Sequence, residues 1–174
     1  MKHCFKYLTL LMLFFSCSEE ETERYLIADE YYKAQTFVST NKNIDINNDG
    51  AVNTNILNEL TNCSPNPYDL LIKEFNSSIL VCFYLPIQYI DFECCPSGSV
   101  EFAMGGFSLS LDNKTDIVEN LEIGNGVVVK YFGKTSEQNY KLILTWGFYD
   151  FSVSDYIATE FEINYKYIET IKGS

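Results

Sequence analysis

The feature that most constrains this chain is a strict alternation of apolar and polar residues near its C-terminal end. In the segment TEFEINYKY, the apolar positions are Phe161, Ile163, Tyr165 and Tyr167, and polar residues stand between them. Successive side chains of a β-strand point to opposite faces, so the pattern puts the four apolar groups on one face. We therefore predict a strand with one buried face, for which the rest of the chain must supply partners.

Other segments carry the same signal and are joined by short, turn-forming stretches. The expected strands cover residues 31–39, 68–75, 79–85, 107–112, 116–123, 127–132, 140–151 and 159–167. Short connections favour an antiparallel meander, because parallel strands need crossover helices that this sequence does not supply. The predicted fold class is all-β, an antiparallel meander closed into a barrel or packed as a sandwich, in a single β-domain over 31–174.

Glycine and proline residues mark where the strands turn or are interrupted. The triplet Gly124–Asn125–Gly126 predicts a tight hairpin between two strands. The pair Gly105–Gly106 interrupts a strand pattern and predicts a bulge or a bend. Pro86 has no N–H group to give to a ladder, so its neighbourhood is expected to be an edge, a bulge or a strand end.

An acidic loop with the sequence DINNDGA precedes the main run of strands. Asp45, Asn47 and Asp49 stand at alternate positions, followed by Gly50 and Ala51. In loops of the form D-x-N-x-D-G, the oxygens at positions 1, 3 and 5 turn toward one centre. The glycine allows the sharp turn, and the seventh residue offers its carbonyl group. The spacing predicts half of a calcium site.

The second half of this loop departs from the EF-hand pattern. An EF-hand places a bidentate glutamate at position 12, where this chain has Ile56. We expect Glu59, on a short helix over 56–61, to complete a structural Ca²⁺ site that spans 45–59. The alternative is a metal-free turn, since Asn-Asp-Gly clusters form turns without a cation. Mutual repulsion of the acidic groups in a bare loop favours calcium.

The N-terminal residues have the pattern of an exported and lipidated chain. A positively charged start precedes an apolar run over 7–15, which is too short for a bilayer that needs about 20 apolar residues. The pair Ser16–Cys17 directly after it resembles a bacterial lipobox. The sequence predicts a lipoprotein signal peptide over 1–16, a lipid on Cys17 and an acidic tether over 17–30. An ordinary secreted protein cut elsewhere is the alternative.

The residues after Cys17 indicate on which side of the outer membrane the protein is expected to lie. Ser18 is followed by three glutamates, and this acidic run resembles the surface-export signal of Bacteroidota lipoproteins. The resemblance implies an outer-membrane protein anchored by acyl chains such as palmitate and exposed on the cell surface. The alternative is a solvated tether on a protein at the periplasmic face.

Four cysteines remain for the body of the chain, namely Cys63, Cys82, Cys94 and Cys95. An even number in an oxidising compartment favours disulfide bonds. Adjacent side chains of an extended strand point to opposite faces, so Cys94 and Cys95 would reach different partners, Cys63 and Cys82 in either pairing. A four-cysteine zinc site is the alternative, but its ligands are usually paired at spacings of two to four residues.

Histidine and charge exclude several classes of function. The only histidine is His3, within the expected signal peptide, so the mature chain would lack histidine-based nucleophilic catalysis and histidine-ligated metals. The net charge of −12 opposes binding to phosphate backbones, so no nucleic-acid partner is expected. Carboxylate chemistry, as in glycoside hydrolysis, stays open, but no pair of acids stands out by its spacing. We therefore expect a protein that is not an enzyme.

The segment over 37–63 resembles the opening of uncharacterised Bacteroidota cell-surface lipoproteins with a lipocalin-like β-domain. The matching residues are Asp45, Asn47, Asp49, Gly50, Thr54, Asn55, Leu57, Glu59, Leu60 and Cys63. The resemblance implies a strand, the acidic loop, a short helix and then a β-meander. That family usually has a tryptophan in its first strand, where Phe37 or Tyr32 would stand in here.

Three kinds of function follow from these expectations. The first is binding of a ligand or partner, either a glycan or a small apolar molecule, because aromatic residues form 16% of the chain. Exposed aromatic rows at Tyr149 and Phe151, or at Tyr165 and Tyr167, would favour glycans, and an enclosed cavity would favour an apolar ligand. The second is a purely structural or assembly role in the envelope, which a filled interior would favour. A carboxylate-based hydrolase is the third.

Overall fold

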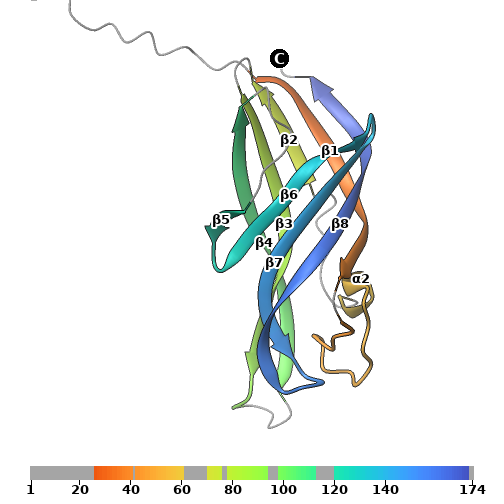
Figure 1. Ribbon diagram of the computed structural model, residues 1–174, viewed down its shortest axis with the longest axis vertical. Coiled ribbons are helices and arrows are strands. Elements are labelled where there is room, and N and C mark those ends of the chain that lie inside the picture. The colour runs from red at the N-terminus through yellow and green to blue at the C-terminus, as the bar shows by residue number, and fades with distance from the viewer. Residues whose placement is uncertain are drawn as a thin grey trace, which may run out of the picture.

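The alternating segments form an eight-stranded antiparallel sheet in the computed structural model of the protein, which describes residues 26–40, 42–60, 70–75, 78–93, 98–112 and 120–172 (Figure 1). The strands are β1 (Leu26–Ser39), β2 (Leu70–Phe75), β3 (Ser78–Asp91), β4 (Ser99–Asp112), β5 (Leu121–Gly124), β6 (Val127–Ser136), β7 (Asn139–Asp150) and β8 (Asp155–Lys172). The helix among the described residues is a single turn, α2 (Ile56–Glu59). The predicted all-β antiparallel fold is confirmed.

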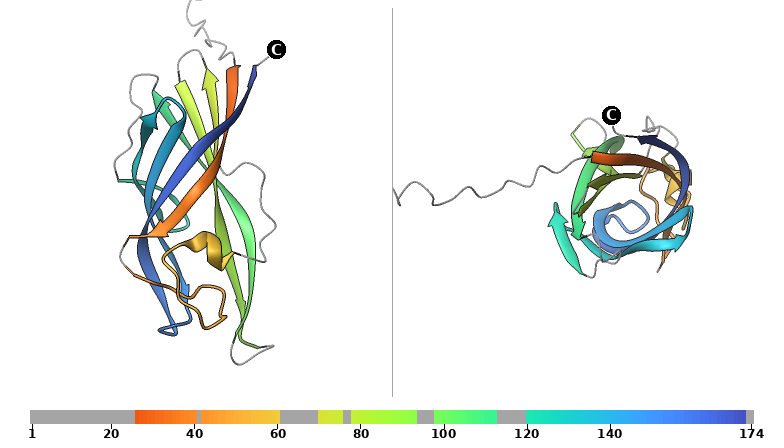
Figure 2. Two further views of the ribbon diagram at one scale, coloured as in Figure 1. Left: turned by 90° about the vertical axis from the view of Figure 1, so that its right-hand side faces the viewer. Right: turned by 90° about the horizontal axis from the view of Figure 1, so that it is seen from above.

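The sheet curls into a nearly closed barrel (Figure 2). Its strand order is β4-β3-β2-β1-β8-β7-β6-β5, so each strand lies beside its neighbours in sequence, and β1 pairs with β8. The two end strands, β4 and β5, approach each other without a hydrogen-bonded ladder, and we call this line the seam. Of the two predicted architectures, the meander barrel is therefore the observed one.

The first strand begins earlier than the sequence pattern indicated. Residues 26–30 were expected to end an acidic tether, yet Leu26 pairs with Phe75 and Ala28 pairs with both Glu74 and Lys172. This boundary is wrong because these residues lack a clean alternation and gain their strand conformation from two flanking strands. Residues 17–25 of the expected tether lie outside the described residues, as does the expected signal peptide.

Strands β3 and β4 form a long ladder, and their pairing explains why a proline is tolerated at position 86 and why a glycine is found at position 105. The ladder of β3 with β2 ends at Phe83, so Pro86 lies where β3 has β4 as its only described partner, as expected for an edge. The register between β3 and β4 is continuous through Gly105, so the predicted bulge is wrong. A Cβ atom at Gly105 would lie 2.3 Å from Cδ1 of Ile87, so the missing side chain makes room for this isoleucine.

Replacing Gly105 by alanine is expected to lower the free energy of unfolding by about 1–3 kcal/mol, because the new methyl group overlaps Ile87. The double variant Gly105→Ala/Ile87→Val, which lacks the overlapping Cδ1 atom, should recover part of this loss. Urea denaturation measures both. Gly106→Ala is the matched control, since its Cβ would meet Tyr84 at 3.4 Å. Equal losses in the two alanine variants would contradict the role given to Ile87.

The predicted hairpin at Gly124–Asn125–Gly126 is confirmed. It joins β5 to β6 through the two residues Asn125 and Gly126, which both have positive φ values of 52° and 72°. Positive φ at both positions is the requirement of a type I′ turn, whose twist matches that of the flanking strands. Of the strand expected over 116–123, residues 116–119 lie outside the described residues, and β5 begins at Leu121.

The apolar face predicted from the alternation fills the barrel. On β8, Phe161, Ile163 and Tyr165 are each 1% exposed, and Tyr167 packs against the core from a half-buried position. Rings from several strands stack edge to face with them, as Phe37 does with Phe161 at a centroid distance of 5.3 Å. The buried residues form one continuous cluster, so the interior is packed with side chains.

The predicted disulfide bonds and anchor are largely outside the described residues. Cys17, Cys63, Cys94 and Cys95 all lie there. Cys82 is a half-buried free thiol on β3, so the structure does not show the disulfide expected for it. Burial raises the pKa of this thiol, Lys73 lowers it by a smaller amount, and Asp29 raises it slightly. The net rise disfavours the reactive thiolate.

No helix in the described ranges is long and apolar enough to cross a bilayer.

Candidate functional site

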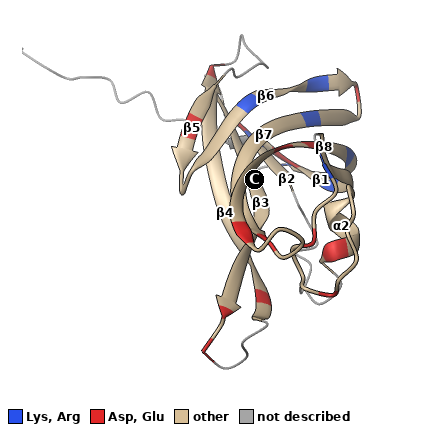
Figure 3. Ribbon diagram, turned by 60° about the horizontal axis from the view of Figure 1, so that its bottom comes forward, with Lys and Arg blue, Asp and Glu red and all other residues tan. Residues whose placement is uncertain are grey.

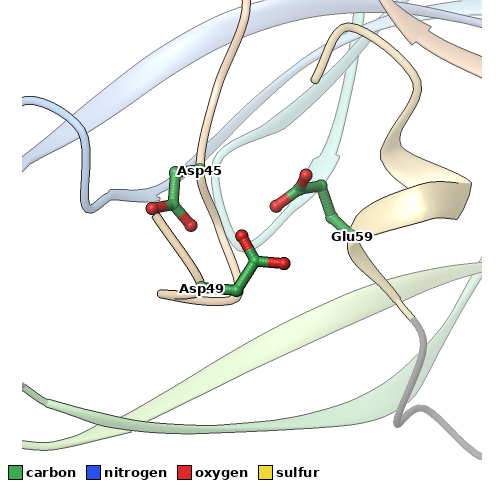
Figure 4. A group of neighbouring side chains, drawn as sticks. All are labelled: Asp45, Asp49 and Glu59. Atoms are coloured by element: carbon green, nitrogen blue, oxygen red, sulfur yellow. The ribbon is translucent and has the colours of Figure 1, made fainter. Parts of the chain in front are cut away.

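The three acidic residues predicted to hold a cation come together at one end of the barrel. One carboxylate oxygen each of Asp45, Asp49 and Glu59 lies within 4.8 Å of the other two. Figure 4 shows the three carboxylates turned toward a common centre, with Glu59 reaching it from α2. Asp45 is 3% exposed and Glu59 is 1% exposed, whereas Asp49 is open to solvent. We call this group the carboxylate cluster.

The backbone of the loop is shaped by the carboxylates of its two aspartates. Oδ1 of Asp45 accepts a hydrogen bond from the N–H of Asn48 at 2.8 Å, and Oδ2 accepts one from the N–H of Gly50 at 3.1 Å. Asn48 and Gly50 have φ values of 61° and 80°, a conformation that asparagine and glycine tolerate best. The N–H of Ala51 donates to Oδ1 of Asp49 at 2.8 Å. The predicted turn at Gly50 is therefore present.

The chain returns to β1 after the loop and then forms α2. Bridges join Ile44 to Asn53 and Val38 to Asn55, so the loop is closed at its base. The side chain of Asn55 caps α2 by accepting a hydrogen bond from the N–H of Leu57 at 3.2 Å. The cap and the buried Ile56 fix the position of this single turn, which is shorter than the helix expected over 56–61.

Glu59 is held as a buried acceptor. Its Oε1 accepts a short hydrogen bond from the side-chain amide of Asn53, and its Oε2 accepts one from the N–H of Ile46 at 3.3 Å. Burial raises the pKa of the Glu59 carboxyl, the two hydrogen bonds lower it, and the charges of Asp49 and Asp45 raise it. The net shift is upward, so a proton competes with a cation for Glu59 at higher pH than for an ordinary glutamate.

The other two predicted ligands border the carboxylate cluster. The amide of Asn47 donates to Oδ2 of Asp49 at 3.1 Å, and its oxygen accepts from the N–H of Asp49. Asn47 and Glu59 also line one cleft of about 280 Å³, together with Val100, Glu101 and Phe102 of β4. Ala51 is exposed, and its N–H is used by Asp49. The structure thus brings Asp45, Asp49 and Glu59 together and places Asn47 beside them.

The β7–β8 turn holds the acidic loop through residues that sequence analysis missed. The N–H of Asp45 donates to Oδ1 of Asp150 at 3.2 Å, and its carbonyl accepts from the N–H of Phe151 at 2.8 Å. Asp150 is 1% exposed, and its second oxygen lies 3.9 Å from Nζ of Lys42. No spacing rule links Asp45 to a residue so far along the chain, so only the fold brings them together.

A second missed residue, Gln88, joins three parts of the molecule. Its side-chain N–H groups donate to the carbonyls of Ile46 at 2.7 Å and of Tyr149 at 3.0 Å. Its side-chain oxygen accepts a hydrogen bond from the N–H of Tyr149 at 2.8 Å. Because Gln88 lies on β3, this one amide fixes the acidic loop and the end of β7 to the opposite side of the barrel.

An aromatic pocket opens along the seam, between β3–β4 and β7–β8 and beside the β5–β6 turn. Its volume is about 360 Å³, and we call it the seam pocket. Buried rings of Phe107, Trp146 and Phe148 line it, as do Tyr89 and Tyr156, which are 57% and 69% exposed. This size is at the lower end of the range for small-molecule sites.

The two aromatic rows whose exposure would favour glycans are not exposed. Tyr165 is buried, and Tyr149, Phe151 and Tyr167 are half-buried. Tyr149 instead lies at the centre of a ring cluster with Phe92, Phe151 and Tyr156, at centroid distances of 4.9–5.4 Å. Tyr165 shares the inward face of β8, as the alternation predicts, so it cannot belong to an exposed row.

Charge is unevenly arranged over the barrel. Figure 3 shows acidic segments at α2 and at the β3–β4 end, and basic segments on β6 and β7. Lys130 and Lys141 on those strands pair with Glu160 and Glu162 of β8, at 2.7 and 3.1 Å. These pairs lie on the outer face of the barrel and neutralise acids that are remote in sequence from the acidic loop. Among the described residues, no lysine forms a salt bridge with Asp45, Asp49 or Glu59.

The fold and the two sites define a class of protein, an antiparallel β-barrel domain with a carboxylate cluster at one end and an aromatic pocket on its seam. No family model, no curated protein and no solved structure matches the chain. The lipoprotein resemblance stays a prediction, and function must be argued from these sites.

Proposed function

We propose that this chain is a lipid-anchored β-barrel domain of the cell envelope, stabilised by a structural calcium ion, that binds a ligand or partner. The proposal of a calcium site rests on one observation. Asp45, Asp49 and Glu59 lie up to 14 positions apart in sequence, and their carboxylates converge in the structure. An all-oxygen donor set suits hard cations such as Ca²⁺. The wider spacing of Glu59 argues for a loop related to, but distinct from, an EF-hand.

Calcium is preferred to magnesium for a geometric reason. The cluster draws on two buried carboxylates, one exposed carboxylate and a neighbouring amide, which is an irregular donor set. Ca²⁺ accepts six to eight oxygens in flexible geometry, whereas Mg²⁺ demands a near-ideal octahedron and keeps its waters. Isothermal titration with CaCl₂ should give one site per chain, with MgCl₂ binding at least about tenfold more weakly. Equal binding of both ions, or none, would contradict the proposal.

The anchor is proposed from Cys17 and the acidic run that follows it. The predicted location is the outer membrane with the barrel on the cell surface, and the periplasmic face is the alternative. Labelling of cells with a fatty-acid analogue should mark the protein, and Cys17→Ser should remove the label. Digestion of intact cells by added protease separates the two locations. A label that persists in Cys17→Ser would exclude this anchor.

The ligand-binding part is supported by the seam pocket, whose rim carries the exposed rings of Tyr89 and Tyr156. Of the two ligand classes expected, a glycan fits better, because the seam pocket carries exposed aromatic rings at its rim and one cluster of buried side chains fills the barrel interior. A glycan array probed with the protein tests this part. The same filled interior favours a second candidate, a structural or assembly role, which a blank array with envelope proteins captured by crosslinking would support.

A further inference from the structure

One edge of β7 is left open within the seam pocket. The ladder of β7 with β6 ends at the pair Val128–Thr145, while β7 itself continues to Asp150. On its other edge, β7 pairs with β8 without interruption down to Asp150–Asp155. The last residues of β7 therefore have one covered edge and one edge that faces the pocket. An open strand edge presents backbone donors and acceptors to whatever approaches it.

The direction of each backbone group on β7 follows from two hydrogen bonds. Opposite residues of an antiparallel pair alternate between hydrogen-bonded and non-hydrogen-bonded positions. The N–H of Tyr167 on β8 donates to the carbonyl of Gln138, so even-numbered residues of β7 are bonded to β8. Tyr149 is bonded to Gln88 instead, which agrees with this alternation. Gly147 therefore turns its N–H and its carbonyl toward the open edge.

Gly147 lies in the only gap along this edge of the described β7. Thr145 is covered by β6, and Tyr149 is covered by the amide of Gln88, while the described ladders and turns give Gly147 no partner there. Gln88 shows what fits such a position, since its single amide group both donates to and accepts from one residue of the strand. Gly147 offers the same donor–acceptor pair one step along the edge, inside the pocket.

The walls beside Gly147 are aromatic and uncharged. The ring of Trp146 is 7% exposed and forms part of the pocket wall. Phe107 and Phe148 lie with it, and Tyr156 stands at the rim. None of the described residues that line the pocket is an aspartate, glutamate, lysine or arginine. Such a site selects a neutral ligand with a flat apolar face and a few hydrogen-bonding groups.

We propose that the seam pocket binds a neutral sugar that carries an acetamido group. The acetamido N–H and C=O would pair with the carbonyl and N–H of Gly147, as the amide of Gln88 pairs with Tyr149. The apolar face of the sugar ring would pack on the aromatic walls. An extended peptide fits less well, because the described edge of β7 leaves only one residue without a partner and strand addition needs a run of several. The inference rests on the ligand-binding part of the proposed function and gives that ligand its chemical class.

Trp146 makes this proposal measurable, because it is the only tryptophan in the chain. Titration of the protein with N-acetylglucosamine should change the tryptophan fluorescence and saturate at millimolar concentrations. Glucose, which has the same ring without the acetamido group, should bind at least about tenfold more weakly, the effect of losing one paired polar group. Equal responses to the two sugars would overturn the role of Gly147, and no response to either would overturn the proposal.

Two variants test the contacts separately. Gly147→Pro removes the edge N–H, which no ladder uses, and should weaken N-acetylglucosamine binding about tenfold while leaving glucose unaffected. Tyr156→Ala, at a 69% exposed position, should weaken both sugars with the melting temperature unchanged. Ile171→Ala, 53% exposed and outside the pocket, is the control and should alter neither. Unchanged affinity in Tyr156→Ala contradicts the site even if the proline variant fails to fold.

The glycan array separates this inference from the broader proposal. An array that is positive for sugars without acetamido groups would leave a glycan-binding domain in place and overturn only the assignment of the ligand. An array and titrations that are both blank would overturn both. Calcium binding is measured by a different experiment, so its outcome affects neither conclusion about the pocket.

Discussion

Addition of calcium is expected to raise the melting temperature of the metal-free protein by about 5–10 °C. A cation that binds only the folded chain stabilises it by RT ln(1 + [L]/Kd), which is about 2.7 kcal/mol at a concentration 100 times Kd. For a domain of this size, each kcal/mol shifts the melting temperature by roughly 2–4 °C. Extracellular calcium sites often have Kd values of about 10⁻⁴–10⁻³ M, so about 10–100 mM CaCl₂ should give the full effect. Differential scanning calorimetry with and without chelator measures it.

The variant Asp49→Asn sharpens this prediction, because it has opposite effects with and without the cation. Its side-chain oxygen can still accept from the N–H of Ala51, so the turn is kept while one charge is lost. Without metal, less repulsion near Asp45 and Glu59 should leave the melting temperature equal or higher. With calcium, the increase should largely disappear. Glu122→Gln, an exposed acid of β5, is the control of equal charge change. A full calcium response in Asp49→Asn would count against the site.

Replacing Phe161 by alanine is expected to lower the free energy of unfolding by about 3–5 kcal/mol, the usual range for a buried phenylalanine. Phe161 is 1% exposed and contacts the rings of Phe37, Trp146 and Phe148, at centroid distances of 5.3, 6.3 and 5.5 Å. Its removal leaves a cavity shared by β1, β7 and β8, which a closed barrel can collapse only in part. Equilibrium denaturation in urea gives the loss.

Two further variants decide whether the loss comes from packing at this position. Phe161→Leu keeps most of the apolar volume and should cost clearly less than alanine. Ile171→Ala, on the exposed part of the same strand, should change the unfolding free energy by no more than about 0.5 kcal/mol. A small loss in Phe161→Ala, similar to that of Ile171→Ala, would show that the barrel is not packed around this ring.

The strands were predictable because their signal is local. Alternation at Phe161, Ile163 and Tyr165 places these side chains on one face whatever the strand pairs with, and all three are buried. The turn at Asn125 and Gly126 was predictable for the same reason, since positive φ values are a property of the residue type. Pairing of β1 with β8 carries no local signal, and it decides between barrel and sandwich.

The sites were predictable only where one loop contains them. Glu59 could be expected near Asp45 and Asp49 because a short helix brings it back within the same segment. Gln88 and Gly147 could not, because their roles depend on where two other ladders end. Gly105 was wrongly predicted to mark a bulge for a similar reason. A glycine is needed there because the side chain of Ile87, on the neighbouring strand, occupies the space of a Cβ atom.

The pairing of Ala28 with Lys172 places the start of β1 and the end of β8 at the same end of the barrel, whereas β1 ends at Ser39 beside the acidic loop (Figure 1). Fourteen residues of strand separate the two ends, about 45 Å at the usual rise per residue. If acyl chains hold the protein at Cys17, upstream of β1, the molecule would stand upright on the bilayer. The carboxylate cluster and the seam pocket would then be presented at the membrane-distal pole, within reach of the surroundings of the cell.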